Sequence, residues 1–339
     1  MDWPLRAGGF AKDYEACWKV DYTKPIQNGP TALGFDYYFG ISASLDMPPY
    51  LYIENDRCQG VPTVEKAWIR KGPAHRDFEA GEVLPTLTAK AVEYIRQQVA
   101  AAKKGRPFFL YFALTAPHTP ILPSVAWSGK SGLNAYGDFV MQVDSTIGQV
   151  LAAIERGGIS ENTLIIVTSD NGCAPAANFA ELATKGHYPS YHFRGHKADI
   201  FDGGHRIPFI ARWPAKIKAG SRSDQLICLN DLMATCADII DVKVPESTAE
   251  DSVSMLPAFL DEAKRPLREA GYTTRPTVPS PSVRVGGSSN SVPTPVAGAF
   301  PDPEWTTSAS FRPSSFTISP ATSARRRTFR HSIPTSWIS

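Results

Sequence analysis

A carboxylate and a carboxamide stand side by side in the tetrapeptide S-D-N-G at residues 169–172. Asp170 and Asn171 come at the end of an apolar run, and Gly172 permits a sharp turn after them. Oxygen ligands of this kind suit a hard cation such as Ca²⁺ or Mg²⁺. The same tetrapeptide is also ordinary turn chemistry, so by itself it leaves both a metal site and an Asx turn open.

Two further segments carry groups that could bind an anion. His118 stands between prolines in T-A-P-H-T-P at residues 115–120, which restricts its backbone, although a lone histidine is weak evidence for a site. Lys197 precedes the glycine pair 203–204, and Arg206 follows that pair. Glycines let a backbone approach a ligand closely, and the cations favour an anion there. A basic loop with a glycine hinge is the alternative interpretation.

The elements that must position these groups alternate between helix and strand. Apolar residues at helical spacing predict the helices, and short continuous apolar runs predict buried strands. The predicted helices cover residues 86–103, 138–156 and 231–241, and the predicted strands cover residues 107–114, 163–169 and 208–213. This order predicts an α/β fold with a mostly parallel sheet flanked by helices. Ligands bind outside the carboxyl ends of strands in such sheets, where His118 and Asp170 stand.

Taken together, these segments resemble the sulfatase family. The tetrapeptide at residues 169–172 matches its metal-binding S-D-N-G, and residues 195–208 match its G-x-K…E-G-G-x-R-x-P block. Asp202 stands where the family usually has Glu. The loop with His118 matches the family's Pro-His segment after a hydrophobic strand. The resemblance spans about residues 1 to 268.

The resemblance implies an alkaline phosphatase-like sulfatase core that hydrolyses sulfate monoesters. Asp170 and Asn171 would ligate the cation, Ca²⁺ or Mg²⁺. Lys197 and His118 would be the catalytic and substrate-binding groups, with Lys197 on the sulfate oxygens and His118 on the sulfate or the leaving-group oxygen. The expected substrate is a sulfated sugar or an aryl sulfate. Family members are often periplasmic or secreted, but no signal peptide is visible, so the compartment stays open.

The family's nucleophile is a formylglycine made from the cysteine of a C-x-P-S-R motif, and none of the five cysteines here begins that pattern. The family's amino-terminal acidic pair and its G-K-x-H-L-G block are also absent from these 339 residues. We therefore expect an N-terminally truncated domain without a nucleophile. We also expect it to lack the first strand of the sheet, which would leave an exposed edge.

Composition divides the chain near Gly271. Residues 1–270 form the expected partial catalytic domain, whereas residues 271–339 contain no Leu and no Lys and are rich in Ser, Pro, Thr and Arg. Such a composition builds no core. The tail could be a disordered linker, a basic interaction tail, or a stretch translated out of frame, and we favour the last.

Other classes of function find less support. The net charge of +2 indicates neither nucleic acid nor a membrane surface, and no apolar stretch is long enough to span a bilayer. A phosphatase or phosphodiesterase of the same superfamily would usually hold two metals with several Asp and His. A non-catalytic remnant remains open because the nucleophile motif is missing. Aromatic residues near Tyr50 and Trp68 could stack on a sugar or pack in the core.

The first prediction concerns turnover. Because these residues contain no C-x-P-S-R nucleophile, the purified 339-residue chain should hydrolyse an aryl sulfate no faster than buffer does. Release of p-nitrophenol from p-nitrophenyl sulfate measures this directly. Clear turnover by homogeneous protein would contradict the expectation.

Overall fold

The computed structural model describes residues 1–8, 10–11, 14–245, 247–268, 270–273 and 283–286. The α-helices are α1 (Ala80–Ala102), α2 (Ala135–Gly157), α3 (Phe179–Thr184), α4 (Asp202–His205), α5 (Asp231–Ile239) and α6 (Leu256–Phe259). The 3-10 helices are η1 (Tyr14–Lys19), η2 (Pro30–Leu33), η3 (Val125–Trp127) and η4 (Pro175–Ala177). The strands are β1 (Trp3–Pro4), β2 (Phe10–Ala11), β3 (Phe39–Gly40), β4 (Ile53–Glu54), β5 (Arg57–Cys58), β6 (Val64–Trp68), β7 (Arg70–Ala74), β8 (Ile165–Thr168), β9 (Phe209–Arg212), β10 (Ala270–Thr273) and β11 (Val283–Gly286).

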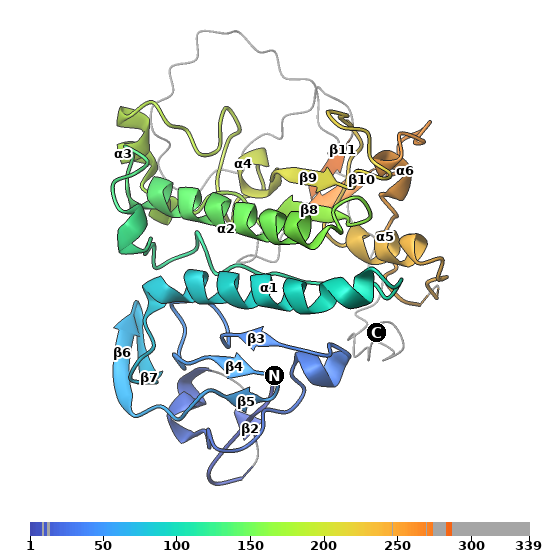
Figure 1. The fold of residues 1–339 in the computed structure, drawn as a ribbon. Helices are drawn as coiled ribbons and strands as arrows, with labels where there is room; N and C mark the ends of the chain where they lie inside the picture. The colour runs from blue at the N-terminus through green and yellow to red at the C-terminus, as the bar shows by residue number, and fades with distance from the viewer. Residues whose placement is uncertain (9, 12–13, 246, 269, 274–282, 287–339) are drawn as a thin grey trace, which may run out of the picture.

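Helices α1 and α2 lie side by side across the middle of the molecule (Figure 1). The hydroxyls of Thr88 and Thr146 meet between them at 3.0 Å, and both are buried. Farther along, Gly157 lies so close to Val99 that an added Cβ would come within 2.7 Å of the valine Cγ2. Each pair is 58 residues apart in the chain, so the two helices run in the same direction.

The boundaries of the predicted helices shift for local reasons. Helix α2 begins three residues before the predicted 138–156 because the Asn134 side chain accepts bonds from the backbone amides of Tyr136 and Gly137. It ends where expected, with Gly158 in the left-handed region at φ 63°. Helix α1 begins six residues before the predicted 86–103. Helix α5 confirms the prediction for 231–241.

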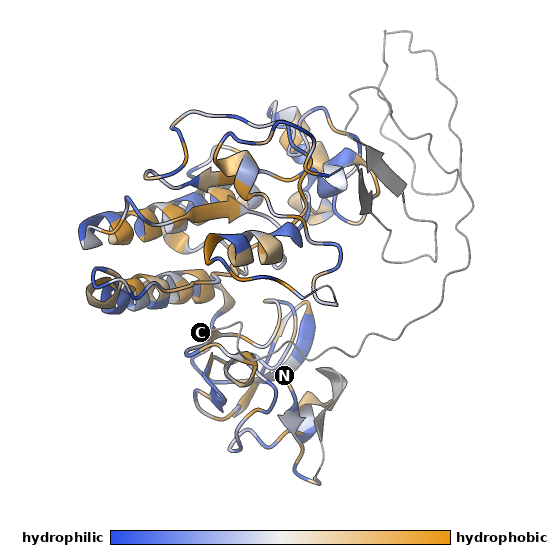
Figure 2. Ribbon diagram, turned by 90° about the vertical axis from the view of Figure 1, so that its right-hand side faces the viewer, coloured by the Kyte–Doolittle hydropathy of each residue, from blue (hydrophilic) through white to orange (hydrophobic). Residues whose placement is uncertain are grey.

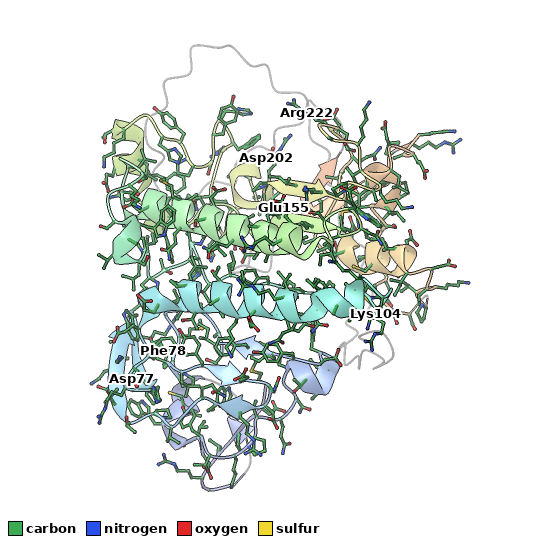
Figure 3. The ribbon with its side chains drawn as sticks, viewed as in Figure 1. Asp77, Phe78, Lys104, Glu155, Asp202 and Arg222 are labelled. Atoms are coloured by element: carbon green, nitrogen blue, oxygen red, sulfur yellow. The ribbon has the colours of Figure 1, made fainter. Side chains whose placement is uncertain are left out.

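The small antiparallel sheets β3–β4–β5 and β6–β7 lie on one side of α1, opposite the side that faces α2 (Figure 1). Aromatic rings join them to the core. Tyr50, only 1% exposed, meets Trp68 edge-on at 4.9 Å and lies 6.0 Å from Phe78. Figure 3 shows Phe78 on this side of α1. Of the two roles left open for these aromatics, packing in the core is confirmed.

Strands β8 and β9 pair beyond α2, and in Figure 2 they stand out as hydrophobic. The alternation of helix and strand agrees with the predicted α/β class. The predicted parallel direction is wrong for this pair, because Ile165 lies opposite Arg212 and Thr168 lies opposite Phe209, an antiparallel register. The return of the chain through residues 169–208 contains only short helices, so nothing forces a parallel crossover.

The predicted strand at residues 107–114 is not part of a ladder. Alternate side chains still face inward: Phe108 and Leu110 pack on the cluster around Ile95, and Phe112 and Leu114 pack on a second cluster. Within the described parts of the chain, however, its backbone forms no backbone hydrogen bond. The segment is extended but unpaired, because no described strand lies against either of its edges.

The predicted tail at residues 271–339 lies outside the described residues except at the β10–β11 pair. Its proposed disorder or frameshift therefore stays a prediction. Among the described helices, none combines the length and the apolar character that crossing a bilayer requires.

The second prediction concerns the α1–α2 core. Ile95 is fully buried between the helices, so Ile95→Ala should lower the free energy of unfolding by about 2–5 kcal/mol through lost burial and a new cavity. The neighbouring Arg96→Ala, at an exposed site, should change it by less than about 0.5 kcal/mol. Urea unfolding followed by circular dichroism compares the two. Equal effects would mean that Ile95 does not support this core.

Candidate functional site

The loop after β8 and the loop before β9 are held together by their backbones. The amide of Gly172 donates to the carbonyl oxygen of Gly204 at 2.9 Å. The amide of Lys197 donates to the carbonyl oxygen of Cys173 at the same distance. These two bonds bring the S-D-N-G tetrapeptide and the G-x-K block into one structure. We call the paired segments, residues 169–173 and 194–204, the interlocked loops.

Glycine is required where the interlocked loops meet. A Cβ on Gly172 would lie 1.8 Å from the Gly203 carbonyl oxygen. On Gly203 it would lie 2.1 Å from the Gly195 oxygen, and on Gly204 it would lie 2.3 Å from the Asp199 oxygen. The sequence correctly predicted a close backbone approach at this glycine pair. The group approached is the protein's own backbone.

Asp170 and Asn171 present oxygen atoms at the start of the first loop. The Asn171 amide nitrogen donates to the Gly172 carbonyl at 3.0 Å, which leaves the side-chain oxygen of Asn171 available. The Ser169 hydroxyl lies 3.5 Å from one oxygen of the exposed Asp170 carboxylate. Among the described residues no cluster of three or more His, Cys, Asp or Glu forms, so this pair by itself would offer only two oxygens to a cation.

Lys197 extends from the second loop. It is half-buried, and its ammonium forms no hydrogen bond or ion pair with the part of the chain that the structure describes. Arg206, by contrast, donates to Asp202 at 3.2 Å and lies over the ring of Phe193. Figure 3 shows Asp202 on α4, on the opposite side of α2 from Phe78. Arg206 and Asp202 therefore brace the loop, and Lys197 is available to bind an anion.

His118 has its ring orientation set by its own loop. Nδ1 lies 2.8 Å from the Thr119 carbonyl oxygen, which can only accept, so Nδ1 carries the proton and donates. The other ring nitrogen, Nε2, is then the atom that can meet a ligand. Asp46 lies 4.0 Å from Nδ1 and would stabilise a positive charge on the ring.

Asp46 was not predicted as a site residue. It is only 7% exposed, and it accepts hydrogen bonds from the Ser44 hydroxyl and the Arg70 guanidinium. Burial alone would raise the pKa of this carboxyl, but the Ser44 bond and the neighbouring Arg70 and His118 outweigh it and hold the pKa below its usual range. The sequence gives no clear signal for it, since Asp46 stands in a mixed stretch that also contains Ser42 and Ser44.

The segments that precede His118 and Asp170 both follow the α1–α2 pair. Residues 107–114 follow α1 and pack back along the helices, and Ile165 of β8 follows α2 and joins the same cluster as Phe108 and Leu110. Because the helices are parallel, both returning segments run the same way. His118 and Asp170 therefore follow the ends of two segments that share one layer.

Cys173, directly after S-D-N-G, is the cysteine nearest to the site. Burial raises the pKa of its thiol, although a hydrogen bond with Tyr136 acts in the opposite direction. The thiolate is the reactive form of cysteine, so a raised pKa keeps Cys173 unreactive near neutral pH. It does not replace the nucleophile that the sequence lacks.

A family model described as Sulfatase matches residues 5–242. The chain is 28% identical over 302 residues to an N-acetylgalactosamine-6-O-sulfatase of Bacteroides thetaiotaomicron, covering 76% of this chain and 59% of that protein. It is 33% identical over 262 residues to the N-acetylgalactosamine-6-sulfatase of Mus musculus, covering 76% of this chain and 48% of that protein. The chain thus spans about half to three fifths of the length of these relatives.

Comparison with solved structures also finds sulfatases. A Bacteroides thetaiotaomicron structure from the metabolism of multiple glycosaminoglycans superposes with a TM-score of 0.65 at 28% identity, covering 74% of this chain and 60% of that one. A sulfatase from Pseudoalteromonas sp. superposes with a TM-score of 0.58 at 24% identity, covering 73% of this chain and 52% of that one. At this lower identity, the likeness to the Pseudoalteromonas structure shows a shared fold.

The third prediction tests the interlocked loops. Gly172→Ala should lower the free energy of unfolding by about 1–3 kcal/mol, because its Cβ would overlap the Gly203 carbonyl. Gly148→Ala is the matched control: nothing lies near that site, which is inside α2, and alanine should stabilise the helix by about 0.5–1 kcal/mol. Thermal unfolding separates the variants. If Gly172→Ala left the free energy of unfolding unchanged, the loops would not be held as described.

Proposed function

Because the chain belongs to the sulfatase family, we propose that it supplies the cation- and sulfate-binding half of a site that hydrolyses sulfate monoesters. One observation supports the proposal: backbone bonds join the loop that carries Asp170 and Asn171 to the loop that carries Lys197, whose ammonium has no described partner. A sulfate monoester spreads negative charge over its oxygens, and a cation and an ammonium at one place match that charge.

Asp170 and Asn171 would hold a divalent cation, Ca²⁺ or Mg²⁺, and members of the family are generally metal-dependent. Their donor set fits a hard cation, since both contribute oxygen and the Asn171 amide is turned so that its oxygen is available. Two protein oxygens are few for Ca²⁺, which takes about six to eight. When bound, the cation supplies Lewis-acid charge at the sulfate oxygens.

The Lys197 ammonium would bind the sulfate oxygens directly. Its backbone amide is fixed by the bond to Cys173, so the root of the side chain is held while the long side chain reaches outward. His118 would act through Nε2, because Nδ1 already donates to Thr119. In its charged form Nε2 could donate to a sulfate or leaving-group oxygen, with Asp46 stabilising that charge from 4.0 Å.

We propose a sulfated sugar as the substrate class, because the matched relatives are named for N-acetylgalactosamine 6-sulfate and related structures come from glycosaminoglycan metabolism. The substrate and partners of the complete site stay part of this proposal. A second candidate is binding of the sulfate ester without turnover. The absence of C-x-P-S-R from these residues favours it, since the covalent route has no nucleophile here.

The fourth prediction tests this site by binding. Lys197→Ala should weaken binding of N-acetylgalactosamine 6-sulfate about tenfold or more in the presence of Ca²⁺, because a charged hydrogen bond contributes about 1.5–3 kcal/mol. Lys216→Ala, at an exposed lysine outside the loops, should not change it. Asp170→Ala should abolish Ca²⁺ binding. Isothermal titration calorimetry measures each variant.

Removal of Ca²⁺ with EDTA should weaken binding of the sulfated sugar, and to the same extent in the wild type and in Lys216→Ala. Unsulfated N-acetylgalactosamine is the ligand control. If Lys197→Ala binds the sulfated sugar as tightly as the wild type, the assignment of the sulfate site to these loops is wrong.

A further inference from the structure

We propose that residues 188–193, here called the aromatic loop, bind a saccharide chain, with the ring of Tyr191 stacked on a sugar unit that neighbours the sulfated one. The aromatic loop belongs to the segment between α3 and α4, on the side of α2 that faces away from α1 (Figure 1). It leads directly into the interlocked loops. The inference rests on the proposed function, because it takes the sulfate to lie at Lys197.

Two successive turns shape the aromatic loop. The amide of Tyr191 donates to the Tyr188 carbonyl oxygen at 2.8 Å, and the amide of Phe193 donates to the Ser190 carbonyl oxygen at 2.9 Å. Tyr191 is the second residue of the turn 190–193, and it lies in the left-handed region at φ 53°. Glycine, asparagine and aspartate are the usual residues at such a position, because a bulky side chain there is strained.

The fold gains little from this strained conformation. The side chain of Tyr191 is 74% exposed, and its ring contacts are with its neighbours His192, at 4.3 Å between centroids, and Phe193, at 6.3 Å. In the same turn the Ser190 hydroxyl is buried and has no hydrogen-bond partner in the described part of the chain. Strain of this kind is typical of binding sites, where a side chain must be held in a set position.

The end of the aromatic loop is fixed to the interlocked loops. The guanidinium of Arg206 lies over the ring of Phe193, 4.7 Å from its centroid. The carbonyl oxygen of the next residue, Arg194, accepts from the Gly203 amide at 2.7 Å. The exposed ring of Tyr191 is therefore carried by a short turn whose base is bonded to the same loops that hold Lys197.

Tyr191 and Lys197 are close enough for one saccharide chain to reach both. Tyr191 stands three residues before Arg194 and six before Lys197. Since a residue spans at most about 3.6 Å, the Cα of Tyr191 lies within about 11 Å of that of Arg194 and within about 22 Å of that of Lys197. A few sugar units cover such a distance, so a sulfate bound at Lys197 would leave neighbouring units near the aromatic loop.

The exposed side chains of the aromatic loop suit an acidic saccharide. Tyr188 is 48% exposed, and Tyr191 and His192 are also exposed. One face of a pyranose ring presents C–H groups that pack on an aromatic ring, while its hydroxyls bond polar tips such as the phenol. The cations Arg194 and Lys197 follow in the chain and favour a ligand with negative charge.

The experiment is isothermal titration calorimetry of the full 339-residue chain with Ca²⁺ present. The two ligands are N-acetylgalactosamine 6-sulfate and a glycosaminoglycan tetrasaccharide that contains this unit. Tyr191→Ala should weaken binding of the tetrasaccharide about tenfold or more, as truncation of an aromatic anchor does, and should change binding of the monosaccharide by less than about twofold. Tyr191→Phe keeps the ring and should bind the tetrasaccharide within about threefold of the wild type. Tyr111→Ala is the matched control, since Tyr111 is 71% exposed and lies outside the aromatic loop, and it should change neither affinity.

Tyr191→Gly separates binding from a structural role. Glycine adopts the left-handed region without strain, so the midpoint of thermal unfolding should rise by about 2 °C or more. Binding of the tetrasaccharide should nevertheless weaken as it does in Tyr191→Ala, because the ring is lost. A lower midpoint would mean that the ring supports the fold, and the inference would be wrong.

Three binding results would also overturn the inference. One is that the wild type does not bind the tetrasaccharide, and another is that Tyr191→Ala binds it as tightly as the wild type does. The third is that Tyr191→Ala weakens both ligands equally. The proposed function fails separately: if Lys197→Ala leaves both affinities unchanged, the sulfate site is wrong, whereas a selective loss in Tyr191→Ala would still assign the saccharide chain to the aromatic loop.

Discussion

The packing of α1 against α2 is the contact on which the remaining structure depends. The two helices approach closely enough for Thr88 and Thr146 to bond and for Gly157 to lie against Val99. Their parallel direction means that the segments leaving their carboxyl ends return the same way. The loop with His118 and the loop with Asp170 follow those segments, so the helix pair determines where the site forms.

Backbone contact sets the finer geometry of the site. Gly172, Gly203 and Gly204 allow two loops to approach to distances that any side chain would prevent. The resulting bonds hold the loop with Asp170 and Asn171 beside the block that contains Lys197. Residues that look functional by type therefore divide into two groups. The glycines, Asp202 and Arg206 build the loop, and Asp170, Asn171 and Lys197 offer free polar atoms.

These 339 residues supply only part of what the proposed reaction would need. Two oxygens do not satisfy a calcium ion, and no cysteine begins the nucleophile motif. Beside the proposed site, residues 107–114 and one edge of β8 have no backbone partner among the residues that the structure describes.

The sequence alone determined the three longest α-helices, the loops after the apolar runs, and the residue types at the candidate site, because these follow from local periodicity and from motifs within a few residues. It predicted α2 to within three residues and named Asp170, Asn171, Lys197 and His118. Tertiary structure decided the antiparallel register of β8 and β9, the lack of a described strand partner for residues 107–114, and the position of Asp46 beside His118. The physical reason is that pairing direction, strand partners and charge neighbours all depend on contacts between residues far apart in the chain.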